Sequence, residues 1–433
     1  MVLGWLTLPY SHFRWFPNLG TTRPLSAFFF TLSFILIFIS KTFRKPFHWT
    51  RLAGIDFFKE ELRSLPGWKF LRWWLILVAL GLVSAVLTLF YGTFLQALNR
   101  LLGYAIIFLY LYCALYSLRA YGLERIARWI SIGYIPVLPY AIIEAIATRN
   151  IPWAYQIIMF VRNATVVPFG WGYRVAFLAT EPSFAAFQLV LLITIWPHLK
   201  SKVLRITNLL LILLSVAFSV SMMVFGLLLA YIILISWLSL SAKSRFRLVS
   251  AICFLILAGF VVLLTSPVVE QKVLSFLHVL ATSNDYSRFR VSPAIRFSYI
   301  LVLFYVVVDT YGLGLGIGQY GYFWKEFYQR HIDYKIFDIG GEVSRALAST
   351  VYMRPWSLVL GIGSDLGLVG LLLFSAFLYQ IYRYCQSPHA RAIVLVSFLA
   401  LMGAYPIVTP HEWLALALMG GCGASNIIQR SRT

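Results

Sequence analysis

Charged residues are scarce in this 433-residue chain, and acidic residues are the scarcest. The 15 Asp and Glu stand against 36 Lys and Arg, and together they make up only 12% of the sequence. Soluble domains carry roughly a quarter charged residues. With 61% hydrophobic residues and a mean hydropathy of +0.82, the composition excludes an ordinary soluble domain. We expect an all-α integral membrane protein.

Motifs for metals and cofactors are missing as well. The four cysteines lack metal or redox spacing, and His411-Glu412 lacks the second histidine of a zinc protease. Neither a Gly-x-Ser-x-Gly elbow nor a phosphate loop occurs. We therefore expect no metal, no cofactor and no ATP-driven step. The net charge of +21 does not indicate nucleic acid, because the basic residues fall in short clusters between apolar runs.

What the sequence has instead is a series of apolar runs close to the 20 residues that cross a membrane. Eleven candidate spans lie near residues 24–40, 73–92, 94–117, 129–147, 175–198, 206–220, 222–240, 248–265, 356–381, 392–409 and 411–428. Residues 298–309 are apolar but short, which favours a helix along the membrane surface over a twelfth span. The fold class predicted is therefore about 11–12 transmembrane helices.

Basic connectors give the orientation of these spans. Four are short and rich in Lys and Arg: 119–128, 200–205, 243–247 and 383–391. The positive-inside rule assigns all four to the cytoplasm. The alternation then assigns 148–174 and 266–355 to the outer side, while the side of the N-terminus stays open. We expect three parts: N-terminal spans (1–265), a large periplasmic loop with short amphipathic helices (266–355) and C-terminal spans (356–433).

The two outer loops contain arginines that the positive-inside rule disfavours there. They are Arg162 and Arg174 in the first loop and Arg288, Arg290 and Arg296 in the second. A guanidinium group binds phosphate bidentately and keeps its charge, so a converging set can hold a lipid-linked pyrophosphate and stabilise it as a leaving group. The competing interpretation is contact with anionic lipid headgroups or loop carboxylates.

Two further candidates are acid–base groups. Glu181, in Thr180-Glu181-Pro182-Ser183, enters an apolar run, where a carboxylate is costly and marks a functional site or an ion pair, with Arg174 as the nearest partner. In the functional case it orients a sugar hydroxyl or takes its proton. His331 with Asp333 has the spacing of a base and its orienting group, although a solvated loop histidine is the commoner explanation of such a residue.

Glycine alternates with Leu and Ile from Gly312 to Gly318. Glycine permits close backbone approach, so Gly314 and Gly316 are candidate contacts to a substrate. No strand–turn–helix context surrounds them, which excludes a dinucleotide fingerprint. The alternative is helix packing, the commoner role of glycine in membrane proteins.

Four segments follow one another in order along the chain: Gly172-Tyr173-Arg174 through Thr180-Glu181-Pro182-Ser183-Phe184-Ala185-Ala186, then Ser219-Val220-Ser221, the arginine loop leading to 312–318, and Gly363-Ser364-Asp365-Leu366-Gly367 through Gly370. Together they resemble the O-antigen polymerase and ligase superfamily of bacterial envelope glycosyltransferases. The resemblance covers roughly residues 172–374.

The resemblance implies a mostly helical enzyme that transfers a glycan from undecaprenyl pyrophosphate to an acceptor sugar outside the cytoplasm. Ligases of this superfamily carry a histidine about ten residues before the glycine that matches Gly367, and here Arg354-Pro355-Trp356-Ser357 stands in that region. A polymerase is therefore expected, unless His331 substitutes for that histidine.

The reaction expected is polymerisation of lipid-linked repeat units in the bacterial inner membrane, with the active site facing the periplasm. Arg288, with Arg290 and Arg296, would hold the donor pyrophosphate, while Glu181 or His331 acts on the acceptor hydroxyl and Arg174 supports Glu181 or a second phosphate. Partners would be the donor and acceptor glycolipids, membrane lipids and a chain-length regulator. The alternatives are a ligase to lipid A core, a transporter or flippase of lipid-linked glycans, and a structural scaffold.

Overall fold

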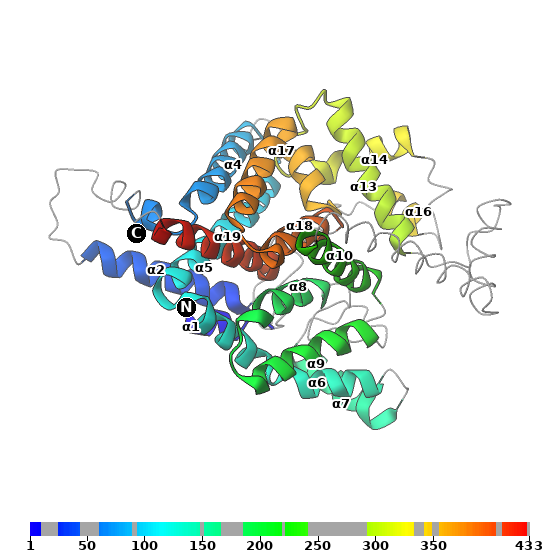
Figure 1. The fold of residues 1–433 in the computed structure, drawn as a ribbon. Helices are drawn as coiled ribbons and strands as arrows, with labels where there is room; N and C mark the ends of the chain where they lie inside the picture. Colours follow the sequence, from blue (N-terminus) through cyan, green and yellow to red (C-terminus); the bar gives the residue numbers. More distant parts are fainter. Residues whose placement is uncertain are drawn as a thin grey trace.

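A computed structural model describes residues 1–9, 25–43, 60–88, 93–147, 151–165, 185–218, 221–240, 292–332, 342–348, 355–403 and 409–430. Of these residues 88% are helical, and none of them forms a strand (Figure 1). The expected all-α class is therefore confirmed for the described part of the chain.

The described residues form a series of helices. In chain order they are α1 (Val2–Leu6), α2 (Leu25–Phe43), α4 (Trp68–Leu87), α5 (Phe94–Tyr134), α6 (Val137–Ala147), α7 (Pro152–Thr165), α8 (Ala185–Ile195), η3 (Trp196–His198), α9 (Lys202–Phe218), α10 (Met222–Ser239), α13 (Ser292–Asp309), α14 (Tyr320–His331), α16 (Glu342–Ala348), α17 (Leu358–Tyr384), α18 (Pro388–Gly403) and α19 (Pro410–Arg430).

Three of these helices are long and apolar enough to cross a membrane: α4, α5 and α17. They correspond to the candidate spans at 73–92, 94–117 and 356–381. Shorter apolar helices occur at Leu25–Ser40, Val137–Ala147, Ala185–His198, Met223–Ser239, Phe297–Asp309 and Pro388–Gly403. The candidate span at 248–265 lies outside the described residues.

One connector differs from its sequence-based description. Residues 119–128, expected as a loop, continue helix α5, which breaks only at Gly122 (φ 75°, ψ 161°). Arg, Leu and Ala are good helix formers, so the basic charges here do not interrupt the hydrogen-bond ladder. The helix ends instead at Tyr134, two residues before Pro136.

The helices expose large apolar side chains. On α4, Leu82, Val83 and Leu87 are each more than half exposed, and on α2 Phe28 is 48% and Leu36 56% exposed. Contiguous exposed apolar surface is rare on soluble monomers. Together with the three long helices, this surface indicates a membrane protein.

The main core is aromatic and surrounds Trp74 of α4. The Trp74 ring lies 5.0 Å from that of Trp413 on α19 and 5.3 Å from that of Phe377 on α17. Its indole nitrogen donates to the carbonyl of Tyr104 on α5 at 2.9 Å. Such ring pairs add about 0.5–1.5 kcal/mol each beyond burial. The core therefore fixes α4, α5, α17 and α19 against one another.

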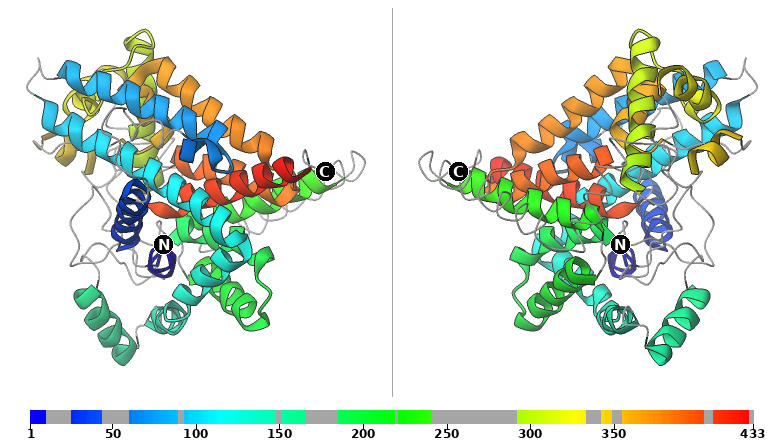
Figure 2. Two further views of the ribbon diagram at one scale, coloured as in Figure 1. Left: turned by 90° about the vertical axis from the view of Figure 1, so that its left-hand side faces the viewer. Right: turned by 90° about the vertical axis from the view of Figure 1, so that its right-hand side faces the viewer.

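A smaller apolar cluster lies within the segment expected as the large outer loop. It joins α13, α14 and α16 through Tyr299, Trp324, Tyr328 and Val343, all buried. Figures 1 and 2 place α13 and α14 at one end of the molecule and α7 at the opposite end. The helix expected over 298–309 is present as α13, whereas its position along a membrane surface stays a prediction.

Candidate functional site

The segment between α13 and α14, Thr310 to Gln319, is called the glycine loop below. All four of its glycines have positive φ: 77° at Gly312, 78° at Gly314, 96° at Gly316 and 75° at Gly318. Other residue types rarely adopt these angles. The alternating glycines are thus required by the shape of the loop itself.

The loop lies directly against a break in α17. At Gly367 the helix adopts φ 65° and ψ −159°. A Cβ atom on Gly314 would lie 2.6 Å from the amide nitrogen of Gly367, so the two backbones touch. The close approach that the glycines were expected to offer a substrate is, at Gly314, an approach to α17.

Two backbone hydrogen bonds hold the loop at this break. The Leu315 amide donates to the Ser364 carbonyl at 2.7 Å, and the Leu368 amide donates to the Gly312 carbonyl at 2.7 Å. Loop and helix thus satisfy each other's polar groups, as burial requires.

Asp365 anchors the loop from below. Its Oδ2 accepts from the Nε atom of Arg100 at 2.6 Å and from the hydroxyl of Tyr104 at 2.9 Å, and its Oδ1 accepts from the Gly318 amide at 3.2 Å. Asp365 and Arg100 are both buried. A buried carboxylate with one cation and three donors is well compensated. It connects α5, α17 and the loop.

Almost every backbone amide of the glycine loop donates a hydrogen bond to an acceptor within the protein. From Thr310 to Gln319 every amide except that of Gly316 donates a hydrogen bond to a protein acceptor. Gly314 donates to Thr310 Oγ1 at 3.1 Å and Ile317 to Ser84 Oγ at 2.9 Å. The loop is therefore unlike the anion-binding loops whose free amides hold phosphate.

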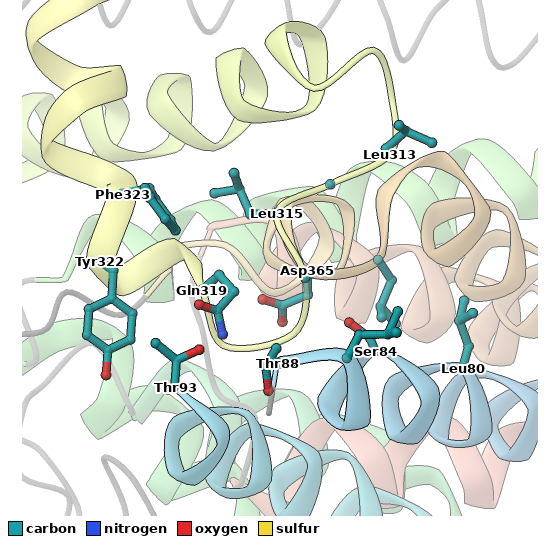
Figure 3. Close-up of a pocket in the computed structure, with 14 residues that line it drawn as sticks. Leu80, Ser84, Thr88, Thr93, Leu313, Leu315, Gln319, Tyr322, Phe323 and Asp365 are labelled. Carbon is teal, nitrogen blue, oxygen red and sulfur yellow. The ribbon is translucent and has the colours of Figure 1, made fainter. Parts of the chain in front are cut away.

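A cavity of about 880 Å³ lies between the loop, α4, α14 and α17 (Figure 3). Its size is in the range of ligand sites, roughly 300–1,000 Å³. Its described lining consists of Leu80, Ser84, Leu87, Thr88, Thr93, Leu313, Gly314, Leu315, Gly316, Gln319, Tyr322, Phe323, Asp365 and Leu366. Figure 3 shows Ser84, Thr88 and Thr93 along α4 and the start of α5, Gln319 facing them from the glycine loop, and Tyr322 and Phe323 at one end.

His331, a catalytic candidate, lies at the far end of α14. Its Nε2 is 2.6 Å from Asp309 Oδ2, and its ring stacks on Tyr305 with centroids 4.4 Å apart. The carboxylate partner is thus Asp309 of α13, whereas the sequence suggested Asp333, which lies outside the described residues. A histidine oriented by a carboxylate is a standard acid–base pair.

A second titratable group near the loop is unsuited to acid–base chemistry. Tyr320 opens α14 and is fully buried. Burial, with Tyr299 and Tyr328 nearby, raises the pKa of Tyr320 well above its usual value. Its phenol keeps its proton at any working pH.

Arg162 is placed apart from this region. It lies on α7, buried, with its Nη1 3.4 Å from Glu144 Oε1 of α6. Figures 1 and 2 show α7 at the opposite end of the molecule from α14. The structure therefore does not bring Arg162 together with His331, Gly314 or Gly316.

Four other candidate residues, and the side chain of a fifth, lie outside the described part of the structure. Arg174, Glu181, Arg288 and Arg290 lie outside the described residues. Arg296 lies on α13, and only its backbone is described. Their convergence stays a prediction.

Residues that the sequence did not single out carry much of the site. Arg100 lies inside the apolar run 94–117, and an arginine within such a run is a signal by itself, because it requires a buried partner. The partner is Asp365, 265 positions away. Ser84, Thr88 and Thr93 gave no signal, since hydroxyl residues are common in membrane helices.

No family model matches this chain, and no curated protein matches it either.

Proposed function

We propose that this protein is a polysaccharide polymerase that joins lipid-linked repeat units on the outer face of the bacterial inner membrane. The observation that carries the proposal is the cavity at the glycine loop, which is lined by hydroxyl and amide side chains and has two aromatic side chains at one end. Such a lining suits a sugar, which offers both hydroxyl groups and apolar C–H faces.

The membrane character of the chain supports a lipid-linked substrate. Exposed apolar side chains occur beside the cavity, where Leu87 and Leu313 are 57% and 81% exposed. A substrate carried on a lipid would stay in the bilayer and present its glycan to this surface. The lipid pyrophosphate is its own leaving group, so the reaction needs no nucleotide.

In the proposed reaction an acceptor hydroxyl oxygen forms a bond to the anomeric carbon of the donor glycan. The bond from that carbon to the pyrophosphate oxygen breaks, and its electron pair leaves with the lipid pyrophosphate. His331, oriented by Asp309 at 2.6 Å, takes the hydroxyl proton. Arg288, Arg290 and Arg296 stabilise the leaving group, while Glu181 and Arg174 assist the acceptor.

The distance along α14 restricts the acceptor. Phe323 at the cavity and His331 are eight residues apart on one helix, a rise of about 12 Å at 1.5 Å per residue. A single sugar does not span this distance. An acceptor that occupies the cavity and reaches His331 is an oligosaccharide, which agrees with a repeat unit.

A second function is favoured by one contact. His331 is oriented by the Asp309 carboxylate. Ligases of the resembled superfamily also carry a histidine, but at a position closer in sequence to the glycine that matches Gly367. A ligase that transfers finished polymer to lipid A core is thus the alternative.

The test is reconstitution of the purified chain with an undecaprenyl pyrophosphate-linked repeat unit, without nucleotide or metal. A ladder of longer lipid-linked glycans on a gel supports the polymerase. Transfer of a preformed polymer only when lipid A core is added supports the ligase. If neither product forms, the proposal is wrong and transport of the lipid-linked glycan into vesicles becomes the next assay.

A further inference from the structure

The cavity at the glycine loop carries no positive charge in its described lining. Asp365 is its one ionised group there, and that carboxylate is already bound by Arg100, Tyr104 and the Gly318 amide. An anionic ligand entering this space would lose water without gaining a cation, which is costly. Every backbone amide of the glycine loop except that of Gly316 already donates within the protein, so the loop does not supply the set of free amides that would replace a cation.

The same lining has unused capacity for neutral hydrogen bonds. The hydroxyl oxygen of Thr93 is buried without a hydrogen-bond partner. Ser84 accepts from the Ile317 amide, which leaves its own O–H to donate, whereas Thr88 donates to the Ala85 carbonyl at 2.6 Å, which leaves its oxygen to accept. A buried polar atom without a partner in a native protein usually marks the place of a water or ligand.

Gln319 and two aromatic side chains complete this surface. Gln319 donates one N–H to the Ile317 carbonyl at 3.3 Å, so its second N–H and its carbonyl oxygen remain for a ligand. Tyr322 and Phe323 line the cavity and are 44% and 43% exposed. Exposed rings beside hydroxyl groups form a surface on which the C–H face of a sugar ring packs.

We infer that this cavity binds an uncharged sugar of the acceptor, and that it discriminates against acidic sugars. The inference rests on the proposed function and assigns one of its two substrates. The reacting sugar of the donor is bonded directly to the pyrophosphate, so it brings anionic oxygens to any pocket that holds it. The outer sugars of the acceptor are separated from their own pyrophosphate by the rest of the repeat unit. A cavity without a cation in its described lining therefore suits the acceptor sugar better than the donor pyrophosphate.

The experiment measures binding without catalysis. The purified full-length chain, in lipid nanodiscs or a sugar-free detergent, is titrated with free disaccharides of neutral hexoses, N-acetylhexosamines and hexuronic acids, followed by saturation-transfer NMR. Maltoside detergents are avoided because their headgroups would compete. The neutral or N-acetylated sugars should bind, and the uronic acids should bind at least tenfold more weakly.

Two cavity variants and two matched controls locate the site. Thr93→Val and Gln319→Leu remove hydrogen-bonding groups and should weaken binding of the neutral sugar about two- to tenfold. Thr31→Val on α2 and Gln156→Leu on α7 make the same changes at exposed positions and should leave binding unchanged. Leu313→Lys adds a cation at an exposed rim position and should improve binding of the uronic acid.

Each result has a distinct meaning. Equal binding of acidic and neutral sugars, no binding of any sugar, or equal effects of the cavity and control variants would overturn the inference. If polymerisation occurs while the cavity variants leave it unchanged, the proposed function stands and the inference fails. If neutral sugars bind through Thr93 and Gln319 but no glycan is transferred, the binding site stands and the proposed function fails.

Discussion

Asp365 on α17 accepts a 2.6 Å hydrogen bond from Arg100 on α5, a contact between residues 265 positions apart. Through the same carboxylate the Gly318 amide joins the glycine loop to both helices. One buried ion pair thus determines the floor of the cavity and the position of the loop above it.

Asp365→Asn should destabilise the protein by about 3–5 kcal/mol, because the Arg100 charge would stay buried without its partner. The midpoint temperature of thermal unfolding, recorded on the detergent-solubilised protein, measures this loss of stability. Glu326→Gln is the control: it breaks an exposed pair with Arg330 and should cost less than about 1 kcal/mol. The double variant Arg100→Met/Asp365→Leu should be more stable than Asp365→Asn, and a less stable double variant would contradict this account.

Gly314→Ala should lower stability by about 1–3 kcal/mol and reduce sugar binding, because alanine at φ 78° is strained and its Cβ would meet the Gly367 backbone at 2.6 Å. Gly226→Ala on α10 is the matched control. Nothing lies within 4 Å of its added Cβ, so it should be neutral or stabilising by about 0.5–1 kcal/mol. Unfolding midpoints of the two variants provide the comparison, and equal midpoints would remove the steric argument.

His331→Gln should reduce the rate of glycan transfer about 10²–10⁴-fold, the usual contribution of a general base, while leaving the unfolding midpoint close to that of the wild type. Asp309→Asn should have a smaller effect in the same direction, because the histidine itself stays in place and loses only the carboxylate that orients its ring and also lies 3.5 Å from Arg330. Initial rates with the lipid-linked repeat unit test both variants. Full activity of His331→Gln would exclude histidine as the base and direct attention to Glu181.

Arg288→Ala should abolish polymerisation while expression and membrane insertion stay intact. Arg288→Lys should be nearly as inactive if the guanidinium binds the pyrophosphate through two hydrogen bonds, since an ammonium group lacks that geometry. Activity in reconstituted vesicles, normalised to folded protein, measures both. An active Arg288→Ala enzyme would disprove the role given to this arginine, and Arg290→Ala and Arg296→Ala then identify the residue that replaces it.

Arg162→Ala tests whether this arginine is structural or binds substrate. Its removal takes away the cation that faces the buried Glu144 carboxylate, so we expect a loss of stability of about 3–5 kcal/mol. The double variant Arg162→Met/Glu144→Leu should restore both stability and transfer activity. If that double variant folds but has no activity, Arg162 contacts the substrate after all.

The helical class, three of the long apolar spans and the helix at 298–309 could be predicted from the sequence, because hydrophobicity and helix propensity are local properties. The glycine pattern of 312–318 was recognised, but its partner was not. Only the fold brings Gly314 against Gly367, and the sequence contains no local sign that the glycines serve contact with α17.

The side-chain partners of individual residues could not be predicted where those partners lie on another helix. His331 was paired with Asp333, its neighbour in sequence, whereas the structure pairs it with Asp309 from the preceding helix. Arg162 was grouped with the other outer arginines on charge alone, but a buried glutamate one helix earlier balances its charge. In both cases the partner depends on how two helices pack, which periodicity does not encode.

The two hydrogen bonds between the glycine loop and α17 also restrict how the site can move. Ser364 and Leu368 are four residues apart, the spacing of a regular helical hydrogen bond, but the Ser364 carbonyl and the Leu368 amide bond to Leu315 and Gly312 instead. The glycine loop therefore bridges the break in α17 through hydrogen bonds to residues on both sides of Gly367. It cannot swing open as an independent flap, because lifting it would expose two backbone groups of α17 without partners. A substrate that displaces the loop must bend α17 with it, so occupancy of the site is coupled mechanically to one of the helices long enough to span the bilayer.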